Sequence, residues 1–247
     1  MFGTQRRKSM GLTIKVMLAA GAFAASVSAQ EPDARALLSR MSSEIAGFES
    51  FIIRGDAYTD ARLAAGQIIE HASEVTLRVR RPGMLRLTNR DSENTTNMFF
   101  SGGVLSVYNE SGNFYAQTNI PEGIESALDF ALNEVGIDAP LLDFVARDLS
   151  GHLLEGAEEV RHLGTSLIRG AVYDHIAIRA PEVDLQIWIA SEGRPLPGKL
   201  AISSKWESGS PRFVVFLSWD TESVIPSQSF TFTPPEDATE IEFLLDP

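Results

Sequence analysis

The sequence predicts an α+β domain with one long antiparallel sheet, an N-terminal helix and a helical insertion near the middle of the chain. Three observations predict it. Many short segments alternate apolar and polar residues, which is typical of half-buried strands. Helical spacing occurs in two places, directly after residue 32 and between residues 121 and 145. We find no repeat, linker or low-complexity segment, so we expect a single domain over residues 30–247.

The first 29 residues have the pattern of a secretory signal peptide. Basic residues at positions 6–8 precede an apolar run over residues 17–27, and small side chains continue to Ala29, where we expect cleavage. The 247-residue chain contains no cysteine. A bacterial lipoprotein needs a cysteine at the cleavage site to carry its lipid. The exported product is therefore expected to diffuse freely and not to be lipid-anchored.

The charge balance argues against two classes of partner. The leader holds four basic residues and no acid, so residues 30–247 carry 17 basic and 33 acidic side chains. A formal net charge of −16 disfavours binding to nucleic acid and to anionic lipid surfaces, since both require a basic surface. The acidity indicates either solubility or an acidic docking surface. No second apolar stretch approaches the roughly 20 residues that span a bilayer.

The N-terminal helix is predicted to open at Pro32 and Asp33 and to end at Gly47. One apolar stripe supports it, with spacings of four, four and three between Leu37, Met41, Ile45 and Phe48. The period changes to two from Phe51 onward, which indicates strands.

Strands are predicted on both sides of the helical insertion. Val75–Arg80 and Leu85–Leu87 form two antiparallel neighbours around a turn at Pro82-Gly83. Further strands are predicted at Met98–Phe100, Val104–Tyr108, Phe114–Thr118, Arg161–Leu167, Val172–Arg179, Asp184–Ala190, Lys199–Lys205 and Phe213–Trp219. The last of these is apolar on both faces. This predicts a sheet that is either covered by helices or curved around an apolar cavity.

The helical insertion is predicted in two parts. The first runs from Pro121 to Val135, and Gly136 is suited to end it. The second is short, beginning at Pro140 and continuing through Val145.

Residues that commonly carry catalysis or bind metals form no recognisable set. The chain has four histidines, at positions 71, 152, 162 and 175, and no two of them have the short spacing of a zinc-binding pair. No cysteine is present to complete a zinc site. His175, inside a predicted strand, is either an isolated ligand or base or a satisfied strand histidine. Ser101-Gly102-Gly103 has the chemistry of a hairpin turn and not of a nucleophile elbow. We therefore expect neither an enzyme nor a metal or other cofactor.

Three segments resemble, in this order, the periplasmic lipoprotein carrier LolA and its fold relatives. They are Val79–Leu85, Ser101–Tyr108 and Ser229–Pro235, and Ala139–Arg147 is similar to that family's mid-chain helix. Most of residues 30–247 resembles more closely a bacterial family of predicted periplasmic proteins, domain of unknown function 2092. The matching segments are Ala127–Phe130, Val135–Ile137, Leu185–Ile189 and Arg194–Pro197.

The resemblance implies a periplasmic, half-open antiparallel β-barrel, LolA-like, whose apolar concave side is capped by a mid-chain helical lid. The carrier family holds acyl chains in that concavity. The ligand-binding residues expected here are Leu77, Val79, Leu85, Leu87, Leu128, Leu132, Leu141, Phe144, Trp188 and Phe216. Trp188 alternates with the apolar face of its strand, so it either lines a ligand surface or is covered by a helix.

The resemblance also implies a latch. In the carrier family an arginine just before the strand-turn proline holds the helical lid, and Arg81 stands at the matching position. Its five donors can reach several lid carbonyls. The alternative is an ordinary surface arginine, because Arg78, Arg80 and Arg86 lie around it in the sequence.

The sequence therefore predicts a non-enzymatic periplasmic binding or carrier protein for an apolar ligand, a lipid or a lipoprotein acyl chain. The alternative is an envelope protein-interaction or stress-sensor module of the same fold. The expected partners are a hydrophobic small molecule or lipid and an envelope membrane protein, with no nucleic acid. The chain is expected to be a monomer.

Overall fold

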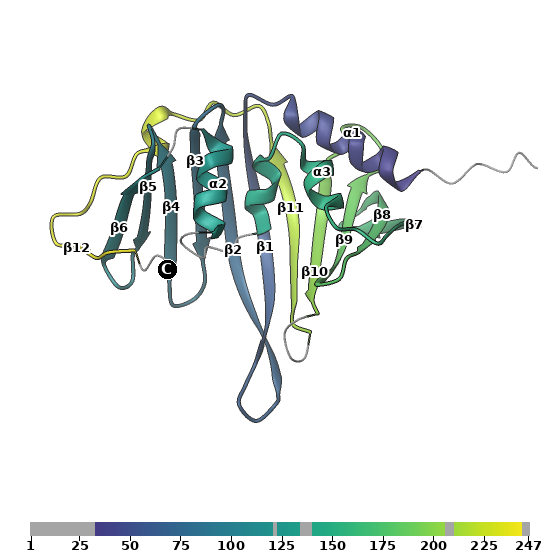
Figure 1. Cartoon of the computed structure of the whole chain (residues 1–247), viewed down its shortest axis with the longest axis horizontal. Helices are drawn as coiled ribbons and strands as arrows, with labels where there is room; N and C mark the ends of the chain where they lie inside the picture. Colours follow the sequence, from purple (N-terminus) through teal and green to yellow (C-terminus); the bar gives the residue numbers. More distant parts are fainter. Residues whose placement is uncertain (1–32, 121–122, 134–139, 206–209, 244–247) are drawn as a thin grey trace, which may run out of the picture. The chain divides into compact units, whose positions relative to one another are not determined.

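The strands of the computed structural model form one sheet in the order β12-β6-β5-β4-β3-β2-β1-β11-β10-β9-β8-β7 (Figure 1). The structure describes residues 33–120, 123–133, 140–205 and 210–243, without the side chains of residues 129, 131–133 and 140. The leader predicted over residues 1–29 lies outside this part. The strands are β1 (Ser50–Arg62), β2 (Ile68–Arg80), β3 (Met84–Arg90), β4 (Thr95–Ser101), β5 (Val104–Asn109), β6 (Phe114–Asn119), β7 (Glu159–Ile168), β8 (Ala171–Arg179), β9 (Val183–Ala190), β10 (Pro197–Ser204), β11 (Arg212–Asp220) and β12 (Thr239–Glu240).

The helices in the described part of the chain are α1 (Ala34–Ala46), α2 (Ile124–Asn133) and α3 (Leu149–Leu154), with the 3₁₀ helices η1 (Pro140–Val145) and η2 (Ser227–Phe230). All of them except η2 lie on one side of this sheet, and η2 packs on the opposite face. In Figure 1, α1, α2 and α3 all lie in front of the sheet. None of the helices in the described ranges is long and apolar enough to cross a membrane.

The sheet is open, and its centre is the long strand β1. This strand pairs antiparallel with β2 on one side and with β11 on the other, which joins the N-terminal and C-terminal strands into one layer. Neighbours are antiparallel throughout except for the short β12, which is parallel to β6. The ends of the sheet, β12 and β7, do not pair with each other. The predicted fold class is confirmed: a curved, unclosed antiparallel sheet with an N-terminal helix and mid-chain helices.

The register divides the sheet into an inner face toward the helices and an outer face. On the inner face, Ile53 lies opposite Leu77, which in turn lies opposite Leu87. These side chains belong to one apolar core with the helix residues Leu37, Leu38, Met41, Ile45, Ile124, Leu141 and Phe144. Because side chains in a strand alternate between faces, the even-numbered residues of β1 and β2 lie on the outer face.

Strand β2 and helix α3 are among the elements that differ from the sequence-based expectation. Strand β2 begins at Ile68, seven residues before the predicted Val75. Of these seven residues, 68–73 pair only with β1 and bury neither face fully, so the apolar alternation that marks a strand is missing there. Helix α3 was not predicted. It is only six residues long. The sequence feature that marks its start is the N-cap residue Asp148, whose carboxylate accepts a hydrogen bond from the Gly151 backbone nitrogen.

The C-terminal segment packs on the outer face. Ile225 and Phe230 are buried against Ile52. Farther along, the ring of Phe232 lies 5.3–5.4 Å, centroid to centroid, from Phe99, Tyr108 and Tyr115. This segment, which includes η2, therefore covers apolar and aromatic side chains on the face opposite α1, α2 and α3.

Replacing Leu38 by Ala should lower the free energy of unfolding by about 2–5 kcal/mol, because Leu38 is fully buried between α1 and the inner face and its loss leaves a cavity. The measurement is urea unfolding followed by circular dichroism. Ser39→Ala is the matched control, since Ser39 is exposed on the same helix and its change should stay within about 0.5 kcal/mol. A loss for Leu38→Ala no larger than that of the control would contradict the packing of α1.

Candidate functional site

A cavity of about 560 Å³ lies between the inner face and the mid-chain helices η1 and α3. This volume is within the range of roughly 300–1,000 Å³ typical of small-molecule sites. Most of its wall is apolar and comes from Val75, Leu87, Leu141, Leu153, Ile178, Ala180, Val183, Leu185, Ile202, Pro211 and Phe213. The cavity is therefore a concave apolar site on the face that the sequence predicted to hold one.

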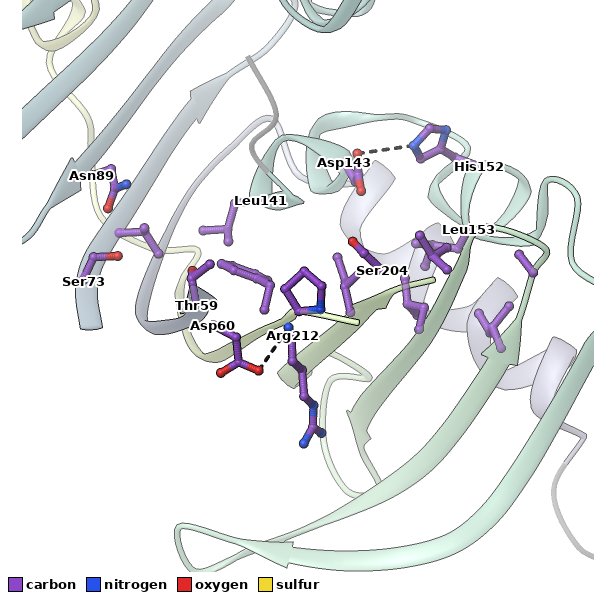
Figure 2. Close-up of a pocket in the computed structure, with 18 of the residues that line it drawn as sticks. Thr59, Asp60, Ser73, Asn89, Leu141, Asp143, His152, Leu153, Ser204 and Arg212 are labelled. Atoms are coloured by element: carbon purple, nitrogen blue, oxygen red, sulfur yellow. Dashed lines mark hydrogen bonds and ion pairs between the residues drawn. The ribbon is translucent and has the colours of Figure 1, made fainter. Parts of the chain in front are cut away.

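The alternation of the strands directs these side chains inward. Val75 of β2 lies on the same face as Leu87 of β3, while Leu185 of β9 lies directly opposite Ile202 of the neighbouring strand β10. The roof is made by Leu141 of η1 and Leu153 of α3. Figure 2 shows Leu141 pointing from η1 toward the strands.

The cavity also has polar lining residues, which come from opposite walls. On the helix side, Asp143 Oδ1 lies 3.3 Å from His152 Nε2. On the strand side, Asp60 Oδ2 accepts a hydrogen bond from the Arg212 backbone nitrogen at 3.2 Å, and both contacts are drawn in Figure 2. The other polar lining residues are Thr59, Ser73, Asn89, Glu155 and Ser204. An apolar wall with a polar margin suits an amphipathic ligand.

The structure brings only part of the predicted ligand set to this cavity. Leu87 and Leu141 line it. The side chains of Leu77, Val79, Leu85 and Phe144 are buried in the adjoining core, against which Leu128 packs. The hollow therefore lies under η1 and α3, while the space near Leu128 of α2 is packed. The side chain of Leu132 lies outside the described part of the chain.

Trp188 and Phe216 do not join the inner-face set and are corrected to the outer face. Strand β9 buries Ile187 and Ile189 inward, so Trp188 between them points outward, and Phe216 does the same in β11. Trp188 is covered by neighbouring side chains and not by a helix. Its ring stacks on His175 with centroids 4.2 Å apart, and Lys199 Nζ lies 4.4 Å from its centroid.

The sequence-based prediction missed most residues of the cavity wall, although the alternation of apolar residues in the strands could have identified them. Ile178, Leu185, Ile202 and Phe213 lie on the inner face by the same alternation that identified Leu87. Trp188 shares its face of β9 with Asp184 and Gln186, and Phe216 lies in β11, which is apolar on both faces. The size of an aromatic ring does not show which face of a strand lines the cavity.

Arg81 contacts the mid-chain helix as the resemblance implied. It is buried in the turn after β2, and its Nη1 donates to the Val145 carbonyl oxygen at 2.8 Å. Burial lowers the pKa of Arg81, nearby Arg147 lowers it further, and Glu125 and Glu49 oppose the shift. The bond joins the sheet to the last residue of η1. A latch function for it stays a prediction.

Titratable groups elsewhere do not converge on the cavity. His162 Nε2 lies 2.9 Å from Asp174 Oδ1, but neither residue lines the cavity. Within the described ranges, no three or more histidine, aspartate or glutamate side chains gather as a metal site would require. On the outer face, burial lowers the pKa of His175, and Gln186 partly opposes this through a hydrogen bond.

Comparison of the whole sequence with protein-family models shows which family the chain belongs to. A family model described as a predicted periplasmic protein, DUF2092, matches residues 34–244. The chain belongs to the DUF2092 family. The predicted family is therefore confirmed, and it places this chain among proteins predicted to be periplasmic.

Solved structures similar to this DUF2092 chain are distant in sequence. Lipoprotein LppX of Mycobacterium tuberculosis is 16% identical, with 79% of this chain and 99% of that chain covered at a TM-score of 0.47. LprF of Mycobacterium bovis is 12% identical, with 78% and 96% covered at 0.45. A LolA superfamily protein of Nitrosomonas europaea is 12% identical, with 81% and 98% covered at 0.36. The chain matches no curated protein.

Arg81→Ala should loosen η1, because the Val145 carbonyl oxygen loses its donor from the sheet. Amide hydrogen exchange measured by mass spectrometry should be faster over residues 140–154 than in the wild type. Arg90→Ala is the control, since Arg90 is exposed and pairs with Glu74 away from the helices. Equal exchange of residues 140–154 in both variants would show that the bond does not hold η1.

His175→Phe should reduce the loss of stability on acidification. The folded pKa of His175 lies below its ordinary value of 6.5, so the unfolded chain binds the proton more readily. Stability is therefore lost as the pH falls through about 6.5 toward the folded pKa. Phenylalanine keeps a ring against Trp188 but has no proton to bind. Urea midpoints measured between about pH 7 and pH 5 should fall less in the variant, and an identical fall would refute the effect.

Proposed function

We propose that this protein is a periplasmic, non-enzymatic binding or carrier protein that shelters an apolar ligand, a lipid or an acyl chain. The observation that carries the proposal is the cavity of about 560 Å³ under η1 and α3 with its aliphatic wall. Membership in a family of predicted periplasmic proteins supports the location.

The energetics of the cavity favour a chain-like ligand. Each methylene group that leaves water for an apolar wall contributes about 0.8 kcal/mol, so a chain of moderate length binds without strong polar contacts. The polar margin around Asp60 and Asp143 lets a head group remain hydrated while the chain is buried. Leu87 and Leu141 contact the chain in this proposal, and the packed core with Leu77, Val79 and Leu85 keeps their strands in place.

In this proposal the ligand enters and leaves by opening of the roof, η1 and α3, while the sheet stays folded. Helices η1 and α3 are only six residues each, and their attachment includes the Arg81 bond to Val145 and the bond from the Ser150 backbone nitrogen to Ser42 Oγ. Although Phe144 and Leu149 are buried in the core, helices as short as these open at a lower free energy than the centre of the sheet. In this proposal they form the lid, and residues 30–247 act as a single monomeric domain.

Ligand binding should be lost when the cavity wall is changed. A fluorescent fatty-acid probe should bind the wild type, while Ile202→Asp and Ser204→Trp should weaken binding about tenfold or more, since about 1.4 kcal/mol corresponds to a factor of ten. Both residues line the cavity and are only partly buried, so the variants are expected to fold. Leu167→Asp is the matched control, because Leu167 is 75% exposed and outside the cavity.

Two results would count against the proposal. If the wild type shows no probe binding by titration and no bound ligand by native mass spectrometry, the carrier function fails. If the probe binds the two cavity variants as well as it binds Leu167→Asp, the ligand does not occupy this cavity. Circular dichroism of each variant establishes that it is folded.

A further inference from the structure

The outer face carries arginines on three adjacent strands. Arg78 of β2 lies directly opposite Arg86 of β3 in the strand register. Arg54 of β1 lies one outer-face position along from Ile52, the β1 partner of Arg78. Like charges directly opposite each other on antiparallel strands are destabilising. The sheet thus holds an unfavourable arrangement at its centre.

The neighbouring acids each pair with an arginine other than Arg78, and one of these arginines is Arg54 itself. Asp220 lies 3.6 Å from Arg54, Glu74 lies 3.2 Å from Arg90, and Asp56 lies 2.7 Å from Arg169. In contrast, the Arg78 guanidinium forms no hydrogen bond or ion pair with any residue that the structure describes. It is half-buried beside two like charges, and none of the described acids pairs with it.

Arg86 is oriented but not paired with an acid directly. Its Nη2 donates to Asn97 Oδ1 at 2.9 Å, and its guanidinium carbon lies 4.7 Å from the centroid of the Phe99 ring. The amide of Asn97 donates in turn to Glu110. These contacts hold Arg86 against the sheet, beside Arg78.

Electrostatics agree with this geometry. Burial lowers the pKa of Arg78, and the charges of Arg86 and Arg54 lower it further, whereas no acid raises it. Residues 30–247 carry a formal charge of −16, so a local concentration of positive charge is not the general character of this surface. An anion bound between these arginines would relieve the repulsion.

We propose that Arg54, Arg78 and Arg86 form a binding site for a phosphate-type oxyanion on the outer face of the sheet. Guanidinium groups present forked donors that match such oxygens and give the stronger, charge-assisted class of hydrogen bond. The site lies on the opposite face from the cavity, so it is independent of the proposed function. A free phosphate and the phosphate of a lipid head group offer the same chemistry.

In the first measurement, inorganic phosphate is titrated at low salt into the protein comprising residues 30–247, and binding is followed by isothermal titration calorimetry. The wild type should bind saturably, and added sodium chloride should weaken binding. Arg78→Gln should reduce the affinity about tenfold or more, since a charge-assisted bond is lost. Arg90→Gln is the control, because it removes the same charge from a paired arginine on the same face, and its affinity should remain within about twofold of the wild type.

A second measurement separates the two sources of phosphate. Vesicles of phosphatidylglycerol and of phosphatidylcholine are sedimented with the protein. Retention by phosphatidylglycerol alone, lost in Arg78→Gln, identifies the lipid head group, while binding of inorganic phosphate without retention identifies the free anion. Absence of both kinds of binding overturns the site, and so does binding that Arg78→Gln leaves intact. Arg78→Gln should be as heat-stable as the wild type at low salt, because the change removes a repulsion.

Discussion

The inner face of the sheet is the constraint on which the rest of the structure depends. Twelve strands in one open layer present a broad apolar surface, and an antiparallel sheet leaves one face free for water only if that face is polar. Here the inner face is apolar, and the helices available to cover it have 13, 10, 6 and 6 residues. Buried residues of α1, α2, η1 and α3 pack against it in one core. The cavity under η1 and α3 is left unfilled, and its exposed apolar wall has a free-energy cost of about 25 cal/mol per Å² that a bound chain removes.

Much of this arrangement could be predicted from the sequence wherever one face alone is buried. The stripe containing Leu37 and Met41 predicts α1, and the alternation around Leu77 predicts the centre of β2, because each pattern records burial on a single side. The prediction failed for Trp188, which is buried on the face that it shares with the partly exposed Asp184 and Gln186, and alternation does not say which side carries the ligand. It also failed for residues 68–73, where no face is fully buried and the strand is held by pairing with β1 alone.

The outer face is covered by different means. Around Trp188, a histidine and a lysine from neighbouring strands cover the ring. At the other end of the sheet, the C-terminal segment places Phe232 among Phe99, Tyr108 and Tyr115. Contacts between residues more than 100 positions apart have no local signature in the sequence. From the sequence alone, such residues look like aromatic residues on a solvent-exposed face, and only the fold shows that they contact one another.

Two arginines close in sequence show how position on the strand sets the environment of a side chain. Arg78 is an even-numbered residue within β2 and therefore faces outward, where its nearest charged neighbours are other arginines. Arg81 follows the last residue of β2 and lies in the turn, where side chains no longer alternate between the two faces of the sheet. Its guanidinium reaches the inner side and donates to the Val145 carbonyl oxygen. Both belong to one run of basic residues, and composition alone does not distinguish them. The end of the strand at Arg80 separates Arg81, which donates a hydrogen bond to η1, from Arg78, for which we propose an anion as the partner.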